Sequence, residues 1–324
     1  MRFWPKMKPV GEMPPGMQES PKGDFDVALT QEQFLDAVDF KTLNDIFDTL
    51  VAKSHGDEAV SNTGHIIERE RITFLENIVH TKLEEGGLSA RGQAMVHTGE
   101  IFMVWDGKDS REPKIKNLDN LHVLVHEATH IRSGFAQGEL RGNSLVKAGR
   151  MGLEDLYGEG DPDKILAFGT SLNEAVTENL SHEVLSEYLL RTGNSSYLTS
   201  PELLNGISGG IYHVDRILFS IIAASLAESM GVSRDEVWKG FVHSYMSGNQ
   251  DVLELLGRIR LELSKSQKIA EMVTLLSSDT SLHGFVSANE IYKALDTNAG
   301  RHEIYSIVCE PFDKKHLQNV LGFR

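Results

Sequence analysis

The chain has 324 residues and an apolar fraction of 40%, which is enough for a substantial hydrophobic core. Its formal net charge of −15 argues against nucleic acid or anionic lipid as a partner held by electrostatic attraction. The single cysteine, Cys309, cannot form a disulfide within the chain, so nothing in the composition requires an oxidising compartment.

Residues 1–23 are predicted to form a flexible lead, because they hold five of the nine prolines together with three glycines. They contain no uninterrupted apolar segment of the kind found in secretory signals. The longest apolar run, residues 217–227, is short of the roughly 20 residues that cross a bilayer and reads as a buried helix. We therefore expect no membrane insertion, and a protein that is cytoplasmic or exported by a route independent of a signal peptide.

Helices and a small sheet are predicted for the first third of the chain. Apolar residues recur at three-to-four spacing after Thr30, which with Gln33 resembles a capping box. A further helix is predicted over 66–83. Short β-prone runs at 95–96 and 101–105, bounded by glycines, predict strands and favour a hairpin.

The next predicted helix starts near Asp119 or Asn120 and ends at Gly134. Residues 134–170 are rich in glycine and read as a long loop region with one short helix. Beyond them, the pattern predicts helices over 171–191, 211–229, 234–246, 250–277 and 288–295, and a strand over 302–308.

The helix before Gly134 carries the motif H-E-x-x-H, formed by His126, Glu127 and His130. Side chains four residues apart on a helix share one face, so the two histidines can bind one cation while Glu127 projects toward a metal-bound water. This layout is typical of a zinc hydrolase site. Such a site keeps one position for water and needs a third protein ligand.

A carboxylate on the following helix is the leading candidate for that ligand. The position six residues after His130 is Ala136, so a third histidine at that spacing is absent. Glu174 lies on the next predicted helix, with Glu178 one turn later on the same face. One of them can bind the metal while the other accepts a hydrogen bond from a ligating histidine. Two alternatives stay open: Glu174 as part of a capping box with Ser171, or a third ligand that is Glu178 or another acid instead.

These two motifs resemble the zincin metallopeptidases, in particular the gluzincin branch with a glutamate as third ligand. The resemblance covers roughly residues 95–250, and it implies His126, His130 and Glu174 as zinc ligands. It also implies Glu127 as the general base and Glu178 as the partner that orients a ligand histidine.

The chain departs from that family pattern at several points. The segment before Glu174 is longer than in thermolysin, and Arg132 occupies a position that is usually apolar. A second zincin branch uses an aspartate as the third ligand. Asp155 lies in a sequence that resembles the motif of that branch but is one residue shorter, so Asp155 is kept as an alternative third ligand. The resemblance further implies a Tyr or His that stabilises the oxyanion, for which Tyr212 and then His213 are candidates.

His122 lies four residues before His126 and His182 lies four residues after Glu178, so each shares a helical face with its neighbour. They admit a second metal, although a supporting hydrogen-bonding or plain polar role is the favoured interpretation.

The sequence thus predicts an α+β, zincin-like fold that is predominantly helical, with a small sheet beside the motif helix. The predicted parts are the lead at 1–23, a segment at 24–192 with the metal site, and a helical C-terminal subdomain at 193–324 that closes the cleft. The expected function is a zinc-dependent metallopeptidase that hydrolyses a peptide or protein substrate by a promoted-water mechanism. The alternatives are a catalytically silent binding or scaffold protein of zincin fold, and a secreted effector or toxin-type protease.

Overall fold

A computed structural model describes residues 24–55, 65–75, 91–96, 98–107, 109–133, 135–137, 146–158, 165–168, 170–199, 219, 223, 227 and 232–247. The proline-rich lead and the elements predicted at 250–277, 288–295 and 302–308 lie outside these residues. Within them the protein is a mixed α+β structure, mostly helical, with two small sheets. No helix in this part of the chain is long and apolar enough to span a membrane.

The contacts divide the chain into two compact units. The first unit comprises residues 10–133 and 177–210, and the second unit comprises residues 1–9, 134–176 and 211–324. Helix α5, Thr170–Arg191, contributes residues to both. The domain boundaries predicted at residues 23 and 192 stay predictions.

The first unit begins with two helices, α1 (Gln31–Ala37) and α2 (Phe40–His55). The predicted capping box is confirmed: the Gln33 amide donates to Thr30 Oγ1 at 3.3 Å, and Gln33 Oε1 accepts from the Thr30 amide at 2.9 Å. These bonds satisfy amides that a helix start leaves without partners. The helices bury the apolar positions that their spacing predicted, among them Phe34, Leu43 and Phe47.

A three-stranded mixed sheet follows, with strands β1 (Ile72–Leu75), β2 (Gly92–Met95) and β3 (Glu100–Val104) in the order β1-β3-β2. The antiparallel pair β2–β3 confirms the predicted hairpin, and Gly99 in its turn has a φ of 76°, a value that favours glycine.

The prediction of a helix over 66–83 is wrong for residues 66–75. They form extended chain, the 3-10 turn η3 (Arg69–Arg71) and strand β1. Ile72 and Phe74 face neighbours on β3 through parallel pairing with Ile101 and Met103. Pairing with a strand that lies 29 residues later in the chain outweighs the local helical pattern.

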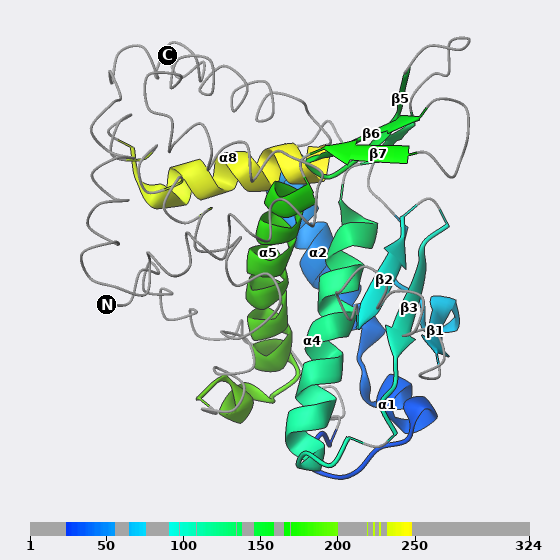
Figure 1. The fold of residues 1–324 in the computed structure, drawn as a ribbon. Coiled ribbons are helices and arrows are strands. Elements are labelled where there is room, and N and C mark those ends of the chain that lie inside the picture. Colours follow the sequence, from blue (N-terminus) through cyan, green and yellow to red (C-terminus); the bar gives the residue numbers. More distant parts are fainter. Residues whose placement is uncertain are drawn as a thin grey trace, which may run out of the picture. The chain divides into compact units, whose positions relative to one another are not determined.

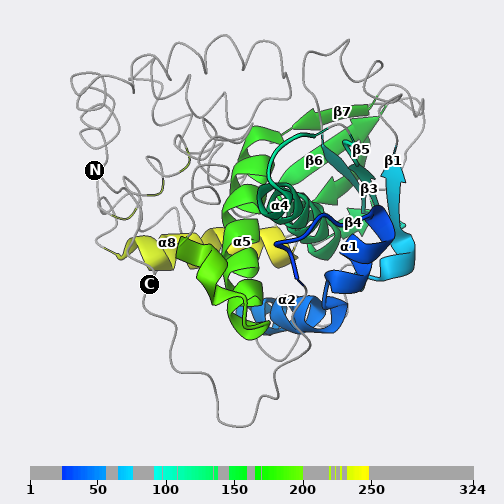
Figure 2. The same ribbon diagram turned by 90° about the horizontal axis from the view of Figure 1, so that it is seen from below.

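Helix α4 (Pro113–Arg132) carries the H-E-x-x-H motif and lies between the three-stranded sheet and α5 (Figures 1 and 2). It begins before the predicted start at Asp119 or Asn120, because Pro113 occupies the first turn, where its missing N–H costs nothing. It ends at Arg132, next to the predicted end, with Ser133 as the cap. Most of its second half is buried, which suits a helix enclosed on two sides.

Helix α5 confirms the prediction for 171–191 to within one residue. It closes at Gly193, whose φ of 72° lets the Asn194 amide donate back to the Leu189 carbonyl at 2.7 Å. Near this end, the Tyr188 hydroxyl accepts the Asp39 amide at 2.8 Å and so joins α5 to the junction between α1 and α2.

In the second unit, the prediction of a loop region at 134–170 is wrong. It holds a four-stranded antiparallel sheet with the order β4-β5-β6-β7. The strands are β4 (Phe135–Gln137), β5 (Val146–Met151), β6 (Glu154–Gly158) and β7 (Ile165–Phe168). Of the glycines that favoured a loop, Gly149 and Gly158 lie within β5 and β6, where antiparallel pairing satisfies the backbone groups, and Gly152 lies in the turn between these strands with a φ of 56°.

Helix α8 (Arg234–Ser247) also belongs to the second unit and matches the predicted range within a residue. Its capping box is confirmed, with the Glu236 amide donating to Ser233 Oγ at 3.2 Å and Glu236 Oε2 accepting from the Ser233 amide at 2.7 Å. Upstream, Phe219, Ala223 and Ala227 are helical and buried, in agreement with the buried helix predicted there. The Phe219 ring packs edge-on against Phe241 of α8 at 4.8 Å.

Candidate metal centre

The facing surfaces of α4 and α5 carry a ladder of titratable side chains. On each helix these side chains recur every four residues and therefore share one face. The ladder consists of His122, His126 and His130 on α4 and of Glu174, Glu178 and His182 on α5. The closest pairs across the helices run in opposite chain directions, so α4 and α5 are antiparallel (Figure 1).

His126 and His130 bring two nitrogens to one point. Both residues are buried, with relative exposures of 6% and 5%, and their Nε2 atoms lie 3.3 Å apart. Bonds of about 2.0–2.1 Å to a tetrahedral zinc place two ligand atoms about 3.3–3.4 Å apart. The separation of the two imidazoles therefore fits a shared cation.

Glu174 completes a group of three. A carboxylate oxygen of Glu174 and one ring nitrogen from each of His126 and His130 all lie within 4.8 Å of one another. Glu174 is half-buried, and α5 begins at Thr170, so Ser171 lies inside the helix and not at the cap position that the alternative interpretation required. The protein thus contains a His-His-Glu group able to hold a metal ion.

Glu178 contacts three histidines of this ladder. Its Oε2 lies 2.8 Å from His126 Nδ1, while its Oε1 lies 3.0 Å from His182 Nε2 and 3.3 Å from His122 Nε2. Burial would raise the pKa of Glu178, but the three imidazoles outweigh that effect and hold its pKa far below the usual range. An ionised Glu178 favours a proton on His126 Nδ1, so that Nε2 of His126 is the nitrogen suited to bind a metal.

Glu127 lies against the edge of the three-stranded sheet. It is 7% exposed, and a Cβ atom built on Gly92 of β2 would lie 2.6 Å from Glu127 Oε1. Only glycine at this position leaves room for the carboxylate. The prediction from sequence did not single out Gly92, although a glycine inside a strand is a known sign of close backbone approach.

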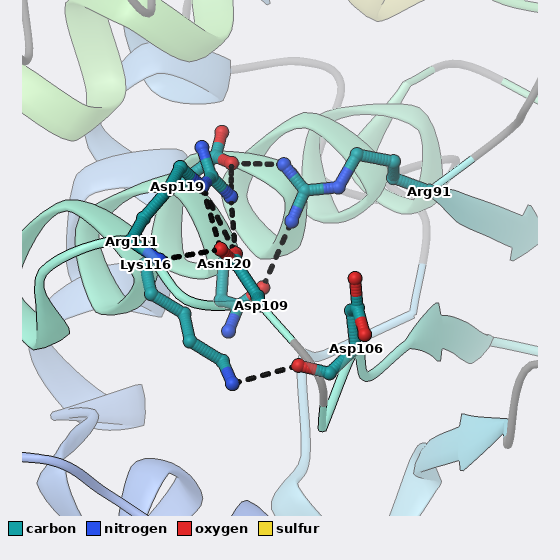
Figure 3. A network of polar contacts seen from close by, with 7 residues as sticks. All are labelled: Arg91, Asp106, Asp109, Arg111, Lys116, Asp119 and Asn120. Atoms are coloured by element: carbon teal, nitrogen blue, oxygen red, sulfur yellow. Dashed lines mark hydrogen bonds and ion pairs between the residues drawn. The ribbon is translucent and has the colours of Figure 1, made fainter.

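An ion-pair network holds the start of β2 on α4 (Figure 3). Arg91 pairs with Asp119 and donates to Asn120 Oδ1 at 3.2 Å, and Arg111 pairs with the same Asp119 at 2.8 Å. Arg111 also binds Asp109, and this hydrogen bond lowers the pKa of Asp109 to about 2. Because Arg91 precedes Gly92, the network fixes the strand beside Glu127.

Arg132, the departure from an apolar residue, is accommodated inside the first unit. It is 3% exposed, forms an ion pair with Asp48 of α2 and lies 6.0 Å from the centre of the Phe47 ring. The buried charge therefore has a partner and an aromatic face.

The structure describes no side chain for the remaining candidates. Tyr212 and His213 are not among the described residues. Asp155 lies on β6, where only the backbone is described, paired with Arg150 and Phe168.

Comparisons with protein-family models, with curated proteins and with solved structures found no match. The functional conclusion therefore depends on the geometry of the site.

Proposed function

We propose that the protein is a zinc-dependent peptidase of gluzincin type. The observation that carries this proposal is the convergence of His126, His130 and Glu174, with Glu127 following His126 on the same helix. Two imidazoles and one carboxylate are a donor set that suits zinc and leaves a position for water.

The residues have distinct roles in this proposal. Bound zinc would supply Lewis acidity at the water and at the substrate carbonyl. Glu127 would accept a proton from a water in the site and deliver it to the leaving amine. Glu178 holds the ring of His126 through the contact at 2.8 Å.

The sheet supports a peptide as the substrate. Among the described strands, β2 has β3 as its only neighbour, so its other edge can accept an extended chain by backbone hydrogen bonding. Gly92 places this strand directly against Glu127. A peptide added along β2 would bring its carbonyl groups near the proposed base. The net charge of −15 argues against nucleic acid as an alternative partner.

The variant Glu127→Gln tests the proposal. It removes the base and keeps the size of the side chain, so we expect the bound zinc to be unchanged and cleavage of an unfolded protein substrate to fall at least about 100-fold. Glu183→Gln, an exposed position on α5, is the matched control and should cleave at the wild-type rate.

Two results would contradict the peptidase. One is wild-type turnover in Glu127→Gln; the other is purified wild-type protein that binds no zinc at the His126–His130 pair. The second result would favour the alternative of a binding protein without catalysis.

A further inference from the structure

We propose that His122, Glu178 and His182 form a second metal site, which takes a divalent first-row transition cation such as Zn²⁺. The three residues lie one helical turn beyond the His126–His130 pair, toward the start of α4 and the end of α5. The proposal does not depend on peptidase activity.

The distances within this second group match those of a coordination shell. Glu178 Oε1 lies 3.0 Å from His182 Nε2 and 3.3 Å from His122 Nε2, and all three donor atoms lie within 4.8 Å of one another. Ligand atoms around a tetrahedral zinc are about 3.3–3.4 Å apart. The two imidazole rings meet edge to face with their centroids 4.9 Å apart, and one nitrogen of each ring lies near the same carboxylate oxygen.

One nitrogen of the group has no hydrogen bond to the described part of the chain. His122 Nε2 is buried, and although it lies 3.3 Å from Glu178 Oε1 it makes no hydrogen bond of acceptable geometry. A buried nitrogen without a well-formed hydrogen bond is energetically unfavourable. A cation placed among the three donors would satisfy both imidazoles and the carboxylate at once. The side chains of His122 and His182 are 13% and 11% exposed, which leaves access for the ion and a water.

Glu178 is a member of this group and also contacts the His126–His130 pair. Its Oε2 contacts His126 Nδ1, and its Oε1 faces His122 and His182. Substitution of Glu178 would therefore affect both sites. His130 and His182 each belong to one group, so variants at these two residues address the sites separately.

The test is the number of ions bound by the full chain. The protein is stripped with a chelator, reloaded with Zn²⁺ and dialysed, and zinc is counted by elemental mass spectrometry. We expect two ions per wild-type chain, one in His182→Gln, one in His130→Gln and none in the double variant. His122→Gln should reproduce the count of His182→Gln. His243→Gln, an exposed histidine on α8, is the control and should keep two ions. Circular dichroism verifies that each variant is folded.

The possible counts separate this inference from the proposed function. One ion per wild-type chain, lost in His130→Gln and kept in His182→Gln, overturns the second site and leaves the first intact. One ion lost only in His182→Gln supports the second site and contradicts the peptidase. A chain that binds no zinc contradicts both. Replacement by Co²⁺ adds an independent readout, because each tetrahedral site contributes its own visible absorption, and His182→Gln should remove one contribution.

Discussion

At the scale of single residues, the placement of Glu127 depends on a missing side chain. Gly92 has no Cβ, and the position that a Cβ would occupy lies 2.6 Å from Glu127 Oε1 and 2.7 Å from Glu127 Cγ. Such distances are far inside van der Waals contact. The proposed base therefore keeps its position only while residue 92 is glycine.

Gly92→Ala should consequently displace the Glu127 carboxylate. Because small errors in the position of a catalytic group are costly, we expect peptide cleavage to fall about 10- to 100-fold while the zinc content stays at the wild-type value. Gln93→Ala, at an exposed position on the same strand, is the control and should have little effect. Wild-type cleavage by Gly92→Ala would show that the contact between β2 and Glu127 is not important for catalysis.

At the scale of elements, the first unit is held by polar contacts between its helices and the segments beside them as well as by its core. Arg132 of α4 pairs with Asp48 of α2, Arg91 pairs with Asp119 of α4, and Tyr188 of α5 accepts the Asp39 amide. Burial raises the pKa of Tyr188, which keeps its hydroxyl neutral over a wide pH range.

Tyr188→Phe should have opposite effects in neutral and alkaline solution. At neutral pH it removes a hydrogen bond and should lower the free energy of unfolding by about 1 kcal/mol. Tyr188 has a raised pKa in the folded protein, so its stabilising contribution is full below the unfolded value of about 10 and is lost as pH rises above it. The variant lacks this group, so its stability should fall less steeply than that of the wild type between about pH 9 and pH 11. Urea unfolding across this range measures both effects, and parallel curves would contradict the argument.

At the scale of the whole molecule, the candidate centre links metal binding to folding. The ligands come from two helices, with His126 and His130 on α4 and Glu174 on α5. An unfolded chain does not hold these groups together. A metal that binds only the folded protein stabilises it by mass action.

Removal of the metal should therefore lower the melting temperature. With free zinc at 100 to 1,000 times Kd, the loss on chelation is expected to be about 3–4 kcal/mol for each occupied site, and added zinc should reverse it. Thermal unfolding followed by circular dichroism gives the measurement. In the His130→Gln/His182→Gln double variant the response should disappear, and a full response there would place the ion elsewhere.

Local sequence patterns determined much of the helical framework. The capping boxes at Thr30 and Ser233, the four-residue spacing of the motif histidines, and the glycine stop at Gly193 act within one or two turns of chain, so they can be read without a tertiary structure. For the same reason the sequence shows that His126 and His130 share a face of one helix.

Only the tertiary structure decided which faces meet and which segments form strands. Residues 72–75 pair in parallel with a strand that lies 29 residues later, whereas β5, β6 and β7 pair with their neighbours along the chain. In both cases the backbone pairing overrides the helical or loop pattern of the segment's own sequence. The proximity of Gly92 to Glu127 and the contact of His126 with Glu178, 52 residues later, likewise depend on packing. A periodic pattern defines the polar face of a helix but not the helix that packs against it. The His-His-Glu group therefore exists only because α4 and α5 pack side by side.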